Sequence, residues 1–499
     1  NPKKMPTKAA WETGKKVADQ LLTDHYKKHG KFPETIGMIM WGTELLRTDA
    51  ISIAEFMYLL GAMPVWNSNG DLQPNPVLIP LENLTITIDG ITIQRPRIDV
   101  FTTAVTGNEI WINIMNNAVK LVSEAPGETA SQNYVIKHLA ENASLDRIFG
   151  LPGMVLEGTG VSDLVPNTGK WKTNDELASV YLSRVSYAWR STSDGVSIEQ
   201  NKNTFQYLLG SADMITQSID STWRLLDTDD YYDWYGGMLL ASRGLGGNPD
   251  DVLVDLRNKN KVVTRTTQEE MGLEIRSQLL NTKYMDSLLN TPSGWMEYAD
   301  KYKNLFAMDV TTNSVSDDMW TQVAQNLLDP RFTATEDYQA FATQSMLGWV
   351  IESARRDIWK ADSGTLTALE DKYVAMVNEY GVSCCHHTCA NVEFNKFLVT
   401  GSSLSLDQLQ QFADAFEGAT GKTIGIIGTP AEDGGQNTNP NQGSTSTSGN
   451  PEPASPGETS TVQAASEVGK TSDSNSQNAH EISEMNNQSS SQSNTPLIA

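Results

Sequence analysis

Residues 31–66, KFPETIGMIMWGTELLRTDAISIAEFMYLLGAMPVW, decide the fold class of this chain. They begin with an apolar run of strand length at residues 36–41, and a helical apolar pattern follows from about residue 50. Ser52 and Glu55 have the S-x-x-E spacing of a capping box, which predicts the start of that helix. Residues 63–66 then have the length and position of a return strand in a right-handed parallel crossover.

The next stretch extends the same pattern. Gly61 predicts the end of the first helix, residues 98–105 read as another apolar strand, and residues 109–122 read as the helix that covers it. Residues 1–130 are therefore predicted to form an open parallel α/β sheet of the Rossmann or flavodoxin type. Ligands of such sheets bind beyond the carboxyl ends of the strands, here at the turns 41–44 and 103–108.

The remainder changes character twice. Residues 131–428 are predicted to be mostly helical, and residues 429–499 lack large apolar side chains and are predicted to be a disordered Ser/Thr/Asn/Pro-rich tail. The predicted fold is thus an α/β N-terminal part, a mostly α-helical region and a disordered C-terminal tail. Apolar residues repeat with the helical period of 3.6 in five segments, at residues 175–189, 268–280, 320–328, 338–359 and 366–380.

Charge and the two ends of the chain bound its function. A net charge of −24 argues against nucleic-acid binding, because a duplex would be repelled. The chain opens at Asn1 without an initiator methionine, so we expect it to be a piece of a longer polypeptide. It ends on Pro-Leu-Ile-Ala, and an alternative expectation is a membrane anchor that begins beyond Ala499.

Two clusters of side chains are candidates for chemistry. Grouped carboxylates suit hard divalent cations or the polar edges of a ligand, and the neighbouring tyrosines offer flat faces for stacking. The alternative is that the acidic residues occupy the first turn of helices, where they favour the helix dipole. This acidic cluster consists of Asp220, Asp227, Asp229, Asp230 and Asp233.

The second cluster holds all three cysteines of the chain beside two histidines. Soft sulfur and nitrogen ligands in one segment indicate a transition-metal site, with a disulfide or redox role and simple packing as alternatives. The predicted metal ligands are Cys384, Cys385, His386, His387 and Cys389.

A glycine-rich stretch at residues 147–153 and 158–160 does not match a phosphate-binding loop, because no Gly-Lys-Ser/Thr closes it. The chain therefore shows no ATP site of its own. Any ATP has to be handled by a partner.

Several motifs in order resemble one family. They are PTKAAWETGKKVADQLL at residues 6–22, the opening stretch, RPRIDV at 95–100, RIFGLPG at 147–153, LLDTDDYYDWYGG at 225–237 and EEMGLEIRSQLLNTKY at 269–284. Together they resemble the C-terminal half of the large subunits of cobaltochelatase and magnesium chelatase, which form one family. The resemblance runs from about Asn1 to Phe397.

The resemblance implies a cytoplasmic enzyme subunit that binds a tetrapyrrole and inserts cobalt, as in cobalamin biosynthesis, or magnesium. Partner AAA+ subunits of such chelatases hydrolyse the ATP. Glu44, Asp227, Asp229 and Asp230 are then candidates for the cavity that holds the macrocycle and the metal. The central catalytic residues stay unknown, since the family's His-Gly-Thr-His-Gly stretch is expected upstream of Asn1, and Tyr235 replaces a histidine of cobalt-type members.

One alternative of a different class remains open. The same fold is compatible with a non-catalytic, extracytoplasmic protein that captures a corrinoid or a metal and is tethered to a membrane by a segment after Ala499.

Overall fold

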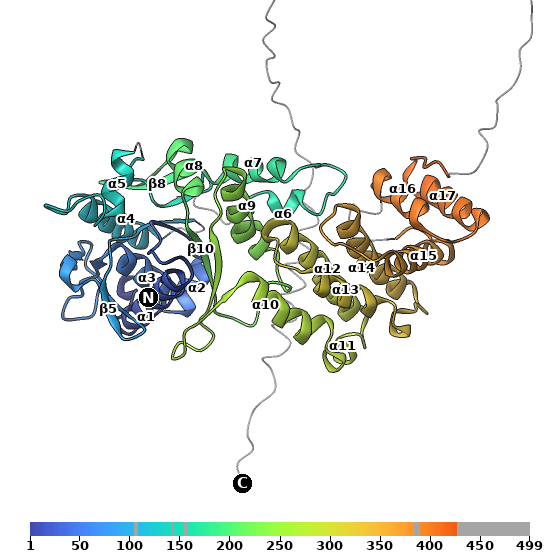
Figure 1. Ribbon diagram of the computed structural model, residues 1–499, viewed down its shortest axis with the longest axis horizontal. Coiled ribbons are helices and arrows are strands. Elements are labelled where there is room, and N and C mark those ends of the chain that lie inside the picture. The colour runs from blue at the N-terminus through green and yellow to red at the C-terminus, as the bar shows by residue number, and fades with distance from the viewer. Residues whose placement is uncertain (104–107, 142, 154–156, 384–389, 427–499) are drawn as a thin grey trace, which may run out of the picture. The chain divides into compact units, whose positions relative to one another are not determined.

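The computed structural model describes residues 1–103, 108–141, 143–153, 157–383 and 390–426 (Figure 1). Contacts between Cα atoms group Asn1–Pro430 into one compact unit. The predicted disordered tail, residues 429–499, and the Cys/His segment, residues 384–389, lie outside the described residues. Within the described ranges, every helix is too short or too polar to cross a bilayer.

A five-stranded sheet organises the N-terminal half of the unit. Its order is β12-β11-β10-β1-β6, with parallel pairing from β11 to β6 and an antiparallel edge strand, β12. The open, mostly parallel α/β sheet predicted from the sequence is therefore confirmed. The strands are β1 (Thr35–Ile39), β6 (Asp99–Thr103), β10 (Met214–Ile219), β11 (Asp250–Asp255) and β12 (Val263–Thr266).

Both faces of the sheet are covered, as parallel sheets require. On one face Ile36 and Met38 of β1 pack with α1 (Lys8–His29), α3 (Ile51–Leu60) and α4 (Glu109–Ser123). On the other face Ile39 of β1 packs with α7 (Asn174–Val185), α8 (Lys202–Gly210) and α9 (Gly237–Gly244). Figure 1 shows α1 and α3 together at the blue end of the chain and α7, α8 and α9 gathered near the top of the view.

The predicted return strand at residues 63–66 is wrong. Ala62–Met63 forms a short strand, β2, which pairs antiparallel with β3 (Val77–Leu78) in a separate sheet, and β1 pairs instead with β6 and β10. Pro64 has no N–H to give to a ladder, so the segment cannot continue as an inner strand.

The predicted capping box is also wrong. The helix begins at Ile51 with Ala50 as its N-cap, at φ 64°, and the Thr48 hydroxyl accepts the Ile51 N–H at 3.3 Å. Ser52 lies inside the helix, and its hydroxyl donates to Glu44 at 2.9 Å. Gly61 does end the helix, at φ 79°, as its position in the sequence predicts.

Two buried arginines explain the RPRIDV motif. The Arg95 guanidinium donates to the carbonyls of Tyr58 and Leu59 at 2.6 and 3.1 Å. Arg97 donates to the carbonyl of Gly61 at 2.7 Å and pairs with Glu128 at 2.8 Å. They satisfy the last carbonyls of α3 and tie that helix to the start of β6.

The later part of the chain is rich in helices, and the five helical segments predicted there are found with small shifts. They correspond to α7, to α10 (Thr267–Glu274) continued by the π-helix η4 (Ile275–Leu279), and to α13 (Asp317–Leu327), α14 (Asp337–Arg355) and α15 (Ser363–Tyr380). The first prediction runs too far, because β8 (Tyr187–Thr192) begins before residue 189. Figure 1 shows α14, α15, α16 (Val392–Gly401) and α17 (Leu406–Thr420) grouped in the orange part of the chain.

The helical reading of residues 131–428 overlooked β10, β11 and β12. Thr216, Gln217 and Ser218 are buried in β10, so this strand does not read as an apolar run. The remaining described elements are α2 (Gly42–Arg47), α5 (Tyr134–Ala140), α6 (Val161–Leu164), α11 (Thr282–Leu288), α12 (Pro292–Thr312), β4 (Thr85–Ile88), β5 (Ile91–Gln94), β7 (Phe149–Gly150), β9 (Gly195–Gln200), the 3₁₀-helices η1 (Pro2–Lys4), η2 (Leu81–Asn83) and η5 (Pro330–Phe332), and the π-helix η3 (Tyr231–Gly236).

Candidate functional site

The carboxyl ends of β1, β10 and β11 meet at one edge of the sheet. Helix α2 follows β1, Asp220 follows β10, and Arg257 lies just beyond β11. Because β1 and β10 are neighbours, α2 lies beside the loop that starts at Asp220, and the Arg47 guanidinium forms an ion pair with the Asp220 carboxylate. This is the edge where open α/β sheets bind ligands.

Glu44 is buried at this edge. Its Oε1 accepts hydrogen bonds from the hydroxyls of Thr48 at 3.0 Å and Ser52 at 2.9 Å. Burial, and then the nearby negative charge of Asp220, raise the pKa of Glu44 to about 7. Glu55 lies in α3, one turn after Ser52, and is also buried. Burial, and then the negative charge of Glu44, raise the pKa of Glu55 well above the usual range.

A pocket of about 690 Å³ lies beyond the ends of β10 and β11. This size falls within the range of small-molecule sites. Trp223 stands at the pocket with 64% of its surface exposed, and Tyr284 adds a second aromatic ring. The residues that line the pocket are Thr222, Trp223, Arg224, Leu226, Asp227, Arg257, Ser277, Gln278, Tyr284, Glu297, Asp300 and Lys301.

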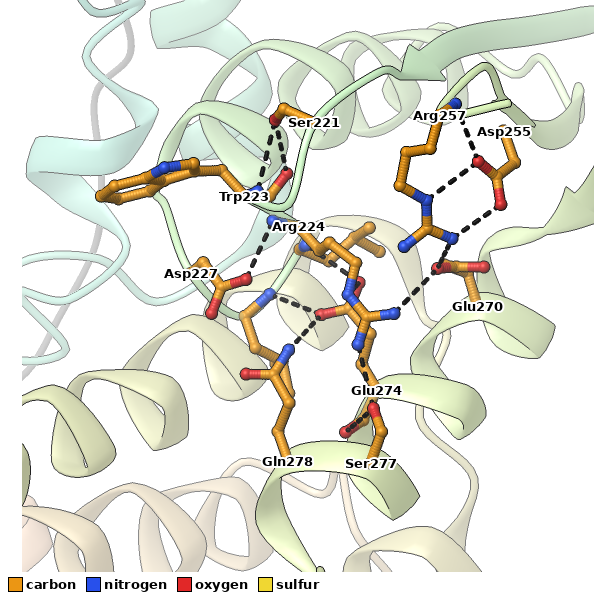
Figure 2. Close-up of polar contacts among 12 residues, drawn as sticks. Ser221, Trp223, Arg224, Asp227, Asp255, Arg257, Glu270, Glu274, Ser277 and Gln278 are labelled. Carbon is orange, nitrogen blue, oxygen red and sulfur yellow. Dashed lines mark hydrogen bonds and ion pairs between the residues drawn. The ribbon is translucent and has the colours of Figure 1, made fainter. Parts of the chain in front are cut away.

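Figure 2 shows how one wall of the pocket is held. The buried carboxylate of Glu274 accepts the backbone N–H groups of Leu225 and Leu226 at 3.1 and 3.0 Å. Burial raises the pKa of Glu274 to about 7, against the opposing effect of the Arg224 guanidinium. Helix α10 thereby fixes the loop that carries Trp223 and Arg224.

The cations of the pocket are already paired with acids. Arg224 donates to the Ser277 hydroxyl at 2.9 Å and lies 3.7 Å from Glu274. Arg257 donates twice to Asp255, at 2.9 and 2.6 Å. The pocket therefore offers polar groups held in fixed positions rather than a strongly basic surface.

The acidic cluster divides in the structure. Asp227 lines the pocket, where it accepts from the backbone of Arg224 at 3.0 Å and from the Lys301 ammonium. Asp233 is buried and accepts from the backbone of Thr159 and Ser162, both at 2.7 Å, so its role is structural. This contact also explains Gly158 of the glycine-rich stretch, since a Cβ there would lie 3.3 Å from the Asp233 carboxylate.

The other predicted site residues lie apart from the pocket lining. Asp229 and Asp230 are exposed at the start of η3, and Glu44 lies in its buried polar group beside Asp220. Tyr235 is fully buried with its hydroxyl 2.8 Å from that of Thr267. The predicted ligands Cys384, Cys385, His386, His387 and Cys389 lie outside the described residues.

Sequence reasoning missed most of the pocket. Arg257 and Lys301 belong to segments far apart in the chain, just beyond β11 and within α12, and only the tertiary fold makes both of them line one pocket. Trp223 and Arg224 could have been found from the sequence, because they lie between Asp220 and Asp227 of the acidic cluster.

Comparison with known proteins places this architecture. Residues 1–366 match the model of the CobN/Magnesium Chelatase family. An uncharacterised protein of Methanocaldococcus jannaschii is 30% identical over 403 residues, which cover 75% of this chain and 31% of that protein. The H-type subunit of magnesium chelatase from Chlorobaculum parvum is 27% identical (75% and 30% covered), and the CobN subunit of aerobic cobaltochelatase from Sinorhizobium sp is 28% identical (72% and 29% covered).

The structural comparison agrees. The chain superposes on the catalytic subunit of cobaltochelatase from Mycobacterium tuberculosis with a TM-score of 0.68 and 27% identity, over 75% of this chain and 32% of that one. The chain thus spans about a third of the length of the relatives it matches. By its sequence match over residues 1–366 and by its fold, this chain belongs to the CobN/magnesium chelatase family.

Proposed function

We propose that this chain is part of the tetrapyrrole-binding subunit of an ATP-dependent metal chelatase, which inserts cobalt or magnesium into a corrin or porphyrin precursor. The observation that carries the proposal is the family match over residues 1–366, a range that includes every residue lining the pocket. Two relatives are named for magnesium chelatase and cobaltochelatase.

The pocket suits a flat macrocycle with polar edges. Trp223 and Tyr284 offer ring faces for stacking, and Arg257, whose side chain is 33% exposed, offers N–H donors to peripheral carboxylates or amides. We assign macrocycle binding to this pocket. Insertion into a porphyrin releases two pyrrole N–H protons as the divalent cation takes their place, whereas a corrin, which binds the metal as a monoanion, releases one.

Partners and location follow from the same proposal. The chain has no phosphate-binding loop in its sequence, so AAA+ subunits would bind and hydrolyse the ATP. Such partners require a cytoplasmic location. The predicted division at residue 130 and the predicted metal binding by the Cys/His segment stay part of this proposal.

Titration of the full chain with protoporphyrin and with a metal-free corrinoid, followed by absorbance, tests macrocycle binding. Trp223→Ala should weaken binding about tenfold, as the loss of roughly 1.4 kcal/mol of aromatic contact requires. Arg257→Ala should weaken it to a similar extent, and Asp255 keeps Arg265 as a partner in that variant, at 3.4 Å. Arg184→Ala is the matched control, because the Arg184 side chain is 41% exposed, close to the 33% of Arg257, and lies outside the pocket lining.

Three outcomes separate the hypotheses. If both pocket variants bind the macrocycle as tightly as wild type does, the macrocycle does not bind in this pocket. A complete assay with the full-length protein that contains this chain, AAA+ partners, ATP and Co²⁺ or Mg²⁺ should convert the absorbance bands to those of the metallated product. A spectral shift that needs no ATP and leads to no metal insertion would instead favour a corrinoid-binding protein on the same fold.

A further inference from the structure

The last turn of α1 carries two histidines, His25 and His29, four residues apart. This spacing places them on one face of the helix, and their ring centroids lie 4.3 Å apart. His25 is buried, whereas the His29 side chain is 36% exposed. The pair played no part in the sequence predictions.

A carboxylate from a distant part of the chain completes the group. Asp250 is the first residue of β11, and its Oδ2 lies 2.9 Å from His25 Nδ1 and 2.8 Å from His29 Nε2. The three donor atoms all lie within 4.8 Å of one another. Tetrahedral ions bound at about 2.1 Å hold their donors roughly 3.4 Å apart, so small side-chain shifts would admit an ion.

The surroundings support an ion at this point. The Lys28 ammonium bonds the other Asp250 oxygen, Oδ1, at 2.6 Å, which orients the carboxylate and leaves Oδ2 directed toward the imidazoles. A cavity of about 210 Å³ adjoins His25 and Asp250 and has room for a water ligand. Its lining holds the acids Asp24, Asp250, Asp251 and Glu269 against the two cations Lys28 and Arg265, so acidic groups outnumber basic ones there.

We propose that His25, His29 and Asp250 bind a divalent transition-metal ion such as Co²⁺, Zn²⁺ or Ni²⁺. Two imidazoles and one carboxylate suit these ions, whereas Mg²⁺ prefers oxygen ligands throughout. Water fills the open coordination position. Binding requires each imidazole to carry its proton on the ring nitrogen that faces away from the ion.

That requirement sets the expected affinity. The outer nitrogen of His25, Nε2, is buried without a hydrogen-bond partner. A proton placed there stays unpaired, which weakens binding of the metal. We therefore expect micromolar rather than nanomolar binding.

This metal site is separate from the pocket of the proposed function and does not depend on it. Asp250 begins β11, whereas Asp255 ends it near the pocket, and five residues of strand span about 17 Å. A metal here joins the end of α1 to the amino-terminal edge of the sheet. Its loss should leave macrocycle binding at the other edge intact.

Co²⁺ titration of the full chain tests the site. Because the Cys/His segment is a second candidate, the parent protein carries Cys384→Ser, Cys385→Ser and Cys389→Ser. We expect the parent to show visible d–d absorption when Co²⁺ binds. Adding His29→Ala or Asp250→Asn should either lower the stoichiometry by one ion per chain or lower the Co²⁺ affinity at least about 100-fold, since even outer-shell changes cost 10–100-fold. Lys27→Ala on the same helix is the matched control, because it pairs with Asp89 and not with Asp250.

The readouts keep the proposal falsifiable. Circular dichroism confirms folding of each variant, and Zn²⁺ should raise the melting temperature of the parent but not of His29→Ala. His386 and His387 are present in every variant, so they cannot produce the difference. Absence of d–d absorption in the parent, or equal Co²⁺ binding by the parent, His29→Ala and Asp250→Asn, would overturn the assignment.

Discussion

At the scale of single residues, buried carboxyl groups distinguish this protein. Glu44, Glu55 and Glu274 are all buried, and burial raises the pKa of each. Glu274 holds a loop through two backbone N–H groups, whereas Glu44 accepts hydrogen bonds from hydroxyls. The three side chains look alike in the sequence, and the structure alone shows that all three are buried and that their hydrogen-bond partners differ.

Glu44→Gln should change the pH dependence of stability. The pKa of Glu44 is raised from 4.5 to about 7 in the folded protein, so the folded state binds its proton more tightly than the unfolded state. That stabilisation is complete below pH 4.5 and is lost as the pH rises through 7, an effect of about 3 kcal/mol. The free energy of unfolding of Glu44→Gln, measured with urea at several pH values, should therefore increase relative to that of wild type between about pH 4.5 and 8.

The control for this prediction is Glu12→Gln, an exposed glutamate that pairs with Lys15. Its difference from wild type should stay nearly constant over the same range. A difference between Glu44→Gln and wild type that does not vary with pH would contradict the environment described for Glu44.

At the scale of elements, close helix packing explains a residue that carries no chemistry. Gly14 of α1 faces α3, and a Cβ placed there would lie 2.7 Å from the Ala54 Cβ and 2.7 Å from the Glu55 backbone nitrogen. The two helices cross at this point because the residue lacks a side chain. Gly14 lies within PTKAAWETGKKVADQLL, one of the motifs that carry the family resemblance, and its close contact with α3 explains why a glycine stands there.

Gly14→Ala should destabilise the protein by about 2 kcal/mol, because the methyl group forces two well-packed helices apart. Gly418→Ala is the matched control: it also lies in a helix, α17, but a Cβ there meets nothing within 4 Å. That control should stabilise by about 0.5–1 kcal/mol through helix propensity. Equal effects of the two substitutions in chemical denaturation would refute the close α1–α3 contact.

At the scale of the whole molecule, the sheet is shared by two hydrophobic cores. Met38 faces the core that includes α1 and α3, and Phe101 faces the core that includes α7 and α8. Both strands that carry them pair directly, as β1 and β6. Loss of packing on one face therefore disturbs the same hydrogen-bond ladder as loss on the other.

Met38→Ala and Phe101→Ala should each lower the free energy of unfolding by about 3–5 kcal/mol. Each should accordingly lower the midpoint of one common thermal transition. Near-ultraviolet and far-ultraviolet circular dichroism should report coincident midpoints in both variants. Leu406→Ala, an exposed position of α17, should leave the midpoint nearly unchanged. Separate transitions for the two faces would show that the two cores unfold independently.

Family, fold class and seven of the seventeen α-helices in the described part of the chain followed from the sequence alone, because apolar periodicity is local and the motifs are collinear. Tertiary structure decided the rest. It rejected residues 63–66 as a sheet strand, added β10–β12, and turned Ser52 from a helix cap into a partner of Glu44. It also placed Arg257 and Lys301 in the lining of one pocket and brought Asp250 to His25, since such placements depend on strand order and packing, which no local pattern encodes.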